Sequence, residues 1–158
     1  MRYGDFRAAV EQSAAAVELF RKLPPELAHE TIVSAAIINL GWSALGLGDH
    51  ALAADSLREG LSICRRLGHV GRIETCSEGL AAVLIAQGRT QRGAQLLGAA
   101  AALRDEHGYG FRDDFQRQVH ERVVADAQAA LGEATFAAAW ARGAAMTPDE
   151  VAEFAETE

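Results

Sequence analysis

The sequence predicts an all-α protein in which antiparallel helix pairs stack into an α-solenoid, and three observations support this. Proline accounts for only 3 of the 158 residues. Apolar residues recur at spacings of three and four along nearly the whole chain, and no stretch alternates apolar and polar residues as a strand does. The third observation is a repeated pattern, whose turn glycines, Gly48 and Gly88, lie 40 residues apart. This period is typical of helical hairpins, which stack because one pair alone does not bury its apolar face.

The first two helices are delimited by proline and glycine. A helix from about residue 5 to 23 must end at Pro24, because the residue before a proline avoids the helical conformation and proline lacks a backbone N–H. A second helix is predicted from Glu26 to Leu47. Gly48 ends it, since glycine readily adopts the left-handed conformation that commonly closes a helix.

The next three helices are bounded by capping residues and further glycines. Asp49 provides a side-chain acceptor for the start of the third helix, and Thr90 does so for the fifth. Gly68 and Gly88 end the third and fourth helices in the manner of Gly48. These signals predict helices at residues 49–67, 70–87 and 90–107.

The sixth helix, predicted from Asp113 to Leu131, carries a narrow apolar stripe at four-residue spacing, formed by Phe115, Val119, Val123 and Ala127. Helical periodicity places these side chains on one face, and we expect that face to pack on the stack.

Two short helices complete the predicted chain, at residues 133–144 and 148–155. The second has an explicit start signal. Thr147 stands at the cap, a proline follows it, and Glu150 lies three residues after the cap. This arrangement predicts a capping box.

Composition limits the function classes. The formal charge of −7 arises from 15 basic and 22 acidic residues. Nucleic-acid phosphates and anionic membranes attract basic surfaces, so neither is an expected partner. No apolar run approaches the roughly 20 residues of a membrane span, and the N-terminus lacks a signal-peptide core. We therefore expect a cytoplasmic protein whose two cysteines, Cys64 and Cys76, are reduced thiols.

The motifs of catalysis and metal binding are missing from the sequence. The single lysine, Lys22, belongs to no glycine-rich phosphate loop, and no two histidines lie four residues apart as metal-binding pairs do. No nucleophile accompanies the helix-surface glutamates. We therefore expect no catalytic residue, no cofactor and no metal. Interspersed acids predict ion pairs for the arginines around the second copy, namely Arg65, Arg66, Arg72, Arg89, Arg92 and Arg104.

The pattern around Gly48 resembles a tetratricopeptide (TPR) repeat. Leu40 and Gly41 in the first helix, the turn formed by Gly48 and Asp49, and the small residue Ala53 in the second helix match that motif. The second copy keeps the spacing, although its first glycine is replaced by alanine, and the 40-residue period exceeds the usual TPR length of about 34 residues.

A third, truncated copy is indicated by Gly4-Asp5-Phe6, which resembles a repeat's turn and second helix. The resemblance therefore implies one domain of residues 1–158, with a partial repeat at 1–25, full repeats at 26–68 and 69–108, and capping helices at 112–155.

The C-terminal third is more specific. Residues 95–104 and 130–147 resemble the end of the TPR-like region in large bacterial ATP-dependent transcriptional regulators of the LuxR and antibiotic-regulator type. The resemblance covers roughly residues 35–155. It implies a non-catalytic module for protein–protein interaction or effector sensing. Its partners would be a protein or peptide, including the ATPase and DNA-binding domains of the same regulator.

The resemblance also implies a groove, because the first helix of each TPR pair lines the concave face. The positions that match this face are Ala35, Ile38, Trp42, Leu45, Thr75, Glu78, Ala82 and Ile85. An apolar face with an aromatic anchor at Trp42 suits an amphipathic helix or a hydrophobic ligand. Two alternatives stay open: the chain's own helices cover the face, or the C-terminal helices close it into a small-molecule pocket walled by Trp42.

The two ends of the predicted stack carry apolar residues. The first helix would leave a face open that two copies can bury in a homodimer, and this face comprises Phe6, Val10, Val17 and Phe20. At the other end, Phe136 and Trp140 share a helix face, because they lie four residues apart. We expect them to cover the last repeat.

Overall fold

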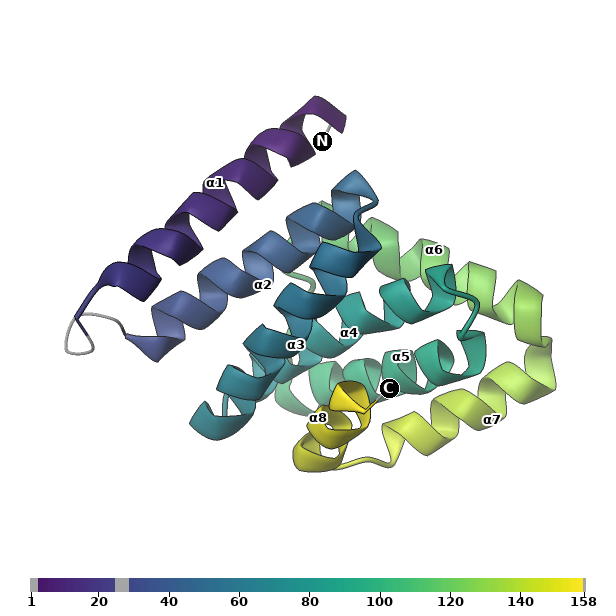
Figure 1. Ribbon diagram of the computed structural model, residues 1–158. Coiled ribbons are helices and arrows are strands. Elements are labelled where there is room, and N and C mark those ends of the chain that lie inside the picture. Colours follow the sequence, from purple (N-terminus) through teal and green to yellow (C-terminus); the bar gives the residue numbers. More distant parts are fainter. Residues whose placement is uncertain (1–2, 25–28, 158) are drawn as a thin grey trace.

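The computed structural model describes residues 3–24 and 29–157, and within these residues it contains eight α-helices and no strand (Figure 1). The all-α prediction is therefore confirmed. The helices are α1 (Tyr3–Lys22), α2 (Glu30–Leu47), α3 (His50–Leu67), α4 (Val70–Ala86), α5 (Thr90–His107), α6 (Asp114–Leu131), α7 (Glu133–Ala144) and α8 (Pro148–Glu156).

Glycines with positive φ end four successive helices. Gly48, Gly68, Gly88 and Gly108 have φ angles of 86°, 66°, 79° and 67° and are spaced 20 residues apart. At the first of these turns, the backbone N–H groups of Gly48 and Asp49 donate to carbonyls of the last helical turn, which satisfies groups that a helix end otherwise leaves unpaired. The turns at Gly48 and Gly68 reverse the chain within two residues and the turn at Gly88 within three, so that α2 packs on α3 and α4 packs on α5.

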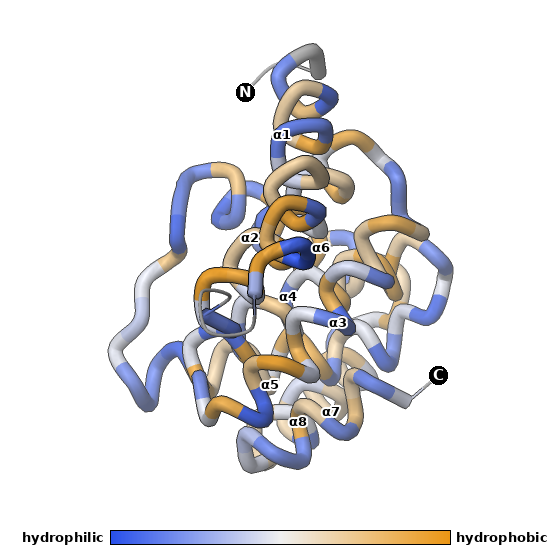
Figure 2. The backbone as a smooth tube through the Cα atoms, turned by 60° about the vertical axis from the view of Figure 1, so that its left-hand side comes forward, coloured by the Kyte–Doolittle hydropathy of each residue, from blue (hydrophilic) through white to orange (hydrophobic). Residues whose placement is uncertain are grey.

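The core lies around α2 and α4, which run through the middle of the molecule (Figure 2). Eleven side chains of α4 are buried, more than half of the helix. Among the described residues, α2 is the one helix long and apolar enough to cross a membrane by length and composition. In this fold α2 is a core helix that packs between α1, α3 and α4.

The last three helices return across this core. Helix α6 packs on α4 and α5, α7 packs on α5 and α8 packs on α3 and α4. The crossing of α5 and α7 is unusually close, because a Cβ atom on Gly143 would overlap the carbonyl oxygen of Gln95. Helix α8 starts with the predicted capping box of Thr147 and Glu150.

Two predicted helix starts need revision. Thr90 was expected to cap α5, but it is the first helical residue, and Arg89 stands at the cap without a side-chain hydrogen bond. Helix α2 begins at Glu30, and the predicted stretch from residue 26 to 28 lies outside the described residues. The predicted cap of α3, Asp49, is confirmed. Asp113, which was expected as the first residue of the sixth helix, stands at the cap of α6, where its side chain accepts from the backbone N–H of Gln116.

The apolar face of the first helix is not open as expected. Helix α1 lies along α2, where Phe6 and Val17 are buried and Val10 and Phe20 are half-buried (Figure 1). The residues that were expected to join two copies therefore pack within the chain.

Candidate ligand-recognition site

The eight predicted groove residues lie on α2 and α4, and the structure brings the two helices together at Trp42. The indole Nε1 of Trp42 donates to the backbone oxygen of Thr75 over 3.3 Å. The indole also packs over Gly79, where an added Cβ would lie 3.3 Å from the ring. Trp42 therefore contacts the part of α4 that carries Thr75 and Gly79.

The concave face is nevertheless not an open groove. Trp42 is only 2% exposed, Glu78 is fully buried, and Ile38, Leu45 and Ala82 are buried as well. The remaining three residues, Ala35, Thr75 and Ile85, are half-buried. Trp42 is therefore a core residue and not the anchor of an open face, as in the alternative in which the chain's own helices cover that face.

Helix α6 covers much of this face. Its predicted stripe packs inward, with Val119, Val123 and Ala127 buried. Phe115, at the start of the stripe, meets Trp42 edge-on with ring centres 6.2 Å apart. The open face and the packing stripe, which the sequence presented as separate features, are thus two sides of one interface.

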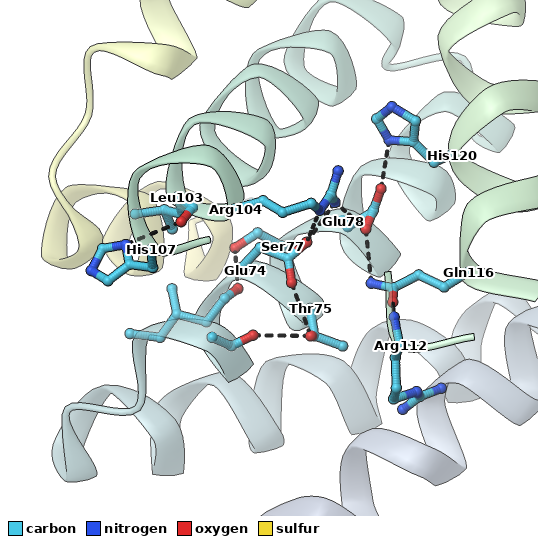
Figure 3. Close-up of polar contacts among 12 residues, drawn as sticks. Glu74, Thr75, Ser77, Glu78, Leu103, Arg104, His107, Arg112, Gln116 and His120 are labelled. Atoms are coloured by element: carbon cyan, nitrogen blue, oxygen red, sulfur yellow. Dashed lines mark hydrogen bonds and ion pairs between the residues drawn. The ribbon is translucent and has the colours of Figure 1, made fainter. Parts of the chain in front are cut away.

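A buried polar cluster joins α6 to α4 and α5 at Glu78 (Figure 3). Its Oε2 accepts from Arg104 Nη2 over 2.6 Å and from Gln116 Nε2 over 2.9 Å. Its Oε1 lies 2.6 Å from Nδ1 of His120, which donates when that nitrogen is protonated. One fully buried carboxylate therefore bonds to groups from two helices.

Glu74 adds a second carboxylate one turn earlier on α4. Arg104 Nη2 donates to Glu74 Oε1 over 2.5 Å, so a single guanidinium bridges both carboxylates. Burial raises the pKa of Glu74 to about 7, against the opposing effect of Arg104. Phe111 stacks on Arg104, with the guanidinium carbon 4.1 Å from the ring centre. The cluster is thus satisfied by the chain's own groups and acts as a polar attachment for α6.

Sequence reasoning did not find this cluster. It placed Glu78 in the groove and predicted an ion pair for Arg104, which forms with Glu74 and Glu78, but it gave Gln116 and His120 no role. The signal that could have found it is the pair Glu74 and Glu78, which lie four residues apart on a helix whose other side chains are largely apolar. Such a pair needs cations from neighbouring elements, because buried charges are costly without partners.

A cavity remains between α1, α2 and the start of α6. It has a volume of about 480 Å³, and Trp42 forms one wall. Phe6 and Phe115 form further walls, with their ring centres 4.7 Å apart and their planes tilted by 50°. Its other lining residues are Ala9, Ser43, Arg112, Asp113, Asp114 and Gln118.

Arg112 is a charged residue of the cavity wall and lies beside the Trp42 ring. Its guanidinium carbon lies 5.8 Å from the centre of the Trp42 ring. Nη1 donates to Asn39 Oδ1 over 3.0 Å, and Nε lies 3.5 Å from Asp113 Oδ2. Its backbone N–H donates to Gln116, so the cavity wall connects directly to the buried polar cluster.

The structure also shows the surroundings of the cysteines and of two arginines that the sequence analysis discussed. Cys64 and Cys76 are buried free thiols, and burial raises the pKa of Cys76 well above its usual value. Arg65 and Arg66 form the expected ion pairs, with Glu156 and Glu30 respectively. Within residues 3–24 and 29–157, no three His, Cys, Asp or Glu side chains come together as metal ligands.

Comparison with models of known protein families, with curated proteins and with solved structures gives no match for this chain.

Proposed function

We propose that this chain is a non-catalytic, TPR-like effector-recognition module of a cytoplasmic bacterial transcriptional regulator, and that the cavity beside Trp42 receives the effector. The regulator assignment rests on the resemblance of residues 35–155. The recognition role rests on the cavity.

The cavity is the observation that carries the proposal. Its volume of about 480 Å³ falls within the range of roughly 300 to 1,000 Å³ that small-molecule sites occupy. It also combines aromatic walls with a few polar groups, which such sites use to orient a ligand. A peptide helix in the predicted groove would instead have to displace α6, together with the bonds from Gln116 and His120 to Glu78.

The position of the cavity suits a sensor. It touches α1 and α2, which are consecutive, and the start of α6, which lies much later in the sequence. A ligand there would contact all three elements, so its binding energy would favour the arrangement in which they lie together. Attached ATPase and DNA-binding domains are the proposed recipients of that change.

The test uses N-phenyl-1-naphthylamine, a neutral aromatic probe whose fluorescence rises in apolar surroundings. We expect saturable binding of one probe per chain in a Trp140→Phe background, where Trp42 is the remaining tryptophan and transfers excitation energy to the probe. Ala9→Leu places a larger side chain in the cavity wall and should weaken binding at least tenfold.

Ala8→Leu is the matched control. Ala8 is the neighbouring residue on α1, is exposed and does not line the cavity, so the same substitution there should leave binding unchanged. Absence of saturable binding, or equal effects of the two leucine variants, would overturn the proposed site.

A protein-binding role is the second candidate, and the groove between α6 and α7 favours it. This groove, of about 800 Å³, is mainly apolar and is lined by Val124, Phe136 and Trp140 among others. A second copy of the chain is one proposed occupant. Sedimentation equilibrium of the wild type and of Trp140→Gln would test it, because a dimer through this groove should weaken in the variant. A strictly monomeric wild type at high concentration would count against it.

A further inference from the structure

We propose that the cavity beside Trp42 recognises an organic cation, an ammonium group with apolar substituents, which competes with the chain's own Arg112 for the aromatic walls. This inference rests on the proposed function of the cavity and adds the chemical class of its ligand.

Three aromatic rings form one wall of the cavity. Phe6 and Phe115 pack with ring centres 4.7 Å apart and a tilt of 50°, and Trp42 meets Phe115 at 6.2 Å and 85°. The rings therefore contact one another at angles, and different parts of their surfaces line the same side of the cavity. Aromatic faces carry negative electrostatic potential and attract cations within about 6 Å, so an aromatic wall of this kind suits alkylated ammonium groups.

A cation of the chain itself, Arg112, already lies beside the aromatic wall of the cavity. The Arg112 guanidinium is 5.8 Å from the centre of the Trp42 ring, within the distance at which a cation–π attraction operates. Its side chain is 39% exposed and bonds to the surface residues Asn39 and Asp113. Arg112 can therefore move outward into water and keep a carboxylate partner, whereas a fully buried arginine could not.

The charged side chains of the cavity wall are mainly acidic. Two carboxylates, Asp113 and Asp114, line the cavity together with one cation, Arg112. Asp113 Oδ2 lies 3.5 Å from Arg112 Nε, and Asp114 accepts from Arg117, which is outside the lining. An anionic ligand would meet both carboxylates, while a cationic ligand would be attracted by them and by the rings. The choice between these ligand classes depends on Arg112, which is either a competitor of the ligand or its anchor.

Three probes of similar shape separate the ligand classes: phenyltrimethylammonium, its neutral isostere tert-butylbenzene, and the anion benzenesulfonate. Displacement of N-phenyl-1-naphthylamine gives the affinities, and calorimetry with phenyltrimethylammonium measures cation binding directly. We expect the cation to bind at least tenfold more tightly than the neutral isostere, with the sulfonate weakest.

Arg112→Gln decides the role of Arg112. Because the variant removes the internal competitor, it should raise the affinity for phenyltrimethylammonium at least threefold. Arg122→Gln removes the same charge from an exposed position on α6 away from the cavity lining, and should change the affinity by much less. Phe115→Leu keeps an apolar side chain but removes one ring, and should reduce the preference for the cation over tert-butylbenzene.

Several outcomes would overturn the inference. Equal affinities for the cation and its isostere would leave a purely apolar cavity. Tightest binding of benzenesulfonate, lost in Arg112→Gln, would make Arg112 an anion anchor. In both cases the naphthylamine probe still binds, so the cavity keeps its proposed function and only the ligand class fails. No binding of the naphthylamine and no calorimetric signal from phenyltrimethylammonium would reject both proposals.

Discussion

At the scale of single residues, Trp42 has two roles, since it is part of the core and also a wall of the cavity. Its indole reaches from α2 to the backbone of Thr75 on α4 and fills the space that Gly79 leaves. A residue in this position contributes to stability whether or not it contacts a ligand.

Trp42→Ala should therefore lower the free energy of unfolding by about 3–5 kcal/mol, the usual cost of emptying a core aromatic site. Urea denaturation measures this. Trp140→Ala is the matched comparison, because Trp140 is half-buried beside an open groove and should cost less. A Trp42 variant as stable as the Trp140 variant would mean that Trp42 is not a core residue.

Glu74 makes a second prediction, about pH. Its folded pKa of about 7 lies above the ordinary 4.5, so the folded state binds a proton more tightly than the unfolded state. The stability that this proton provides is present below pH 4.5 and is lost as the pH rises through about 7. The change for this one carboxyl is of the order of 3 kcal/mol.

Glu74→Gln should remove this dependence, because glutamine is neutral at every pH and keeps a hydrogen-bond acceptor for Arg104. The measurement is the difference in free energy of unfolding between the two proteins at pH 5 and pH 8. The wild type should lose more stability than the variant as the pH rises. If the two proteins lost the same free energy of unfolding between pH 5 and pH 8, the pKa of Glu74 would not be raised in the folded state.

At the scale of helices, two glycines serve different purposes. Gly48 needs its positive φ of 86°, and an added Cβ there would meet no atom within 4 Å. Gly143 has no positive φ, but its Cβ would overlap the backbone of α5. The first glycine sets the turn between α2 and α3, and the second allows α7 to approach α5.

Gly48→Ala should therefore cost about 1–2 kcal/mol, the penalty of left-handed backbone in an L-residue. Gly143→Ala should cost more, about 3 kcal/mol or above, because two packed helices must separate. Thermal or urea unfolding of both variants provides the comparison. A larger loss of stability in Gly48→Ala than in Gly143→Ala would show that α5 and α7 do not pack as closely as the structure indicates.

The helix boundaries show what sequence signals can provide at this scale. The helix ends at Gly48, Gly68 and Gly88 were predictable from the sequence, because few residues other than glycine adopt the positive φ that these turns require. The start of α5 was not, because only Arg89 lies between the turn residue Gly88 and the first helical residue, Thr90. Turn geometry therefore fixes the cap at Arg89, although Thr90 is chemically the better capping residue.

At the scale of the whole molecule, the sequence predicted the helices better than the surfaces they cover. The resemblance assigned Trp42 and Glu78 to one concave face, and periodicity found the stripe of α6. Periodicity does not say which surface a stripe packs against. The closure of the concave face by α6 and the cavity beside it could therefore be recognised only from the three-dimensional structure.

The cavity is the central claim, and nuclear Overhauser effects from the methyl protons of bound phenyltrimethylammonium test it most directly. The methyl protons should show effects to the rings of Trp42, Phe6 and Phe115 in the wild-type chain, because these effects arise only between protons that lie close together and these rings form the cavity wall. Effects to Phe136 and Trp140 instead, or to no ring at all, would contradict the claim.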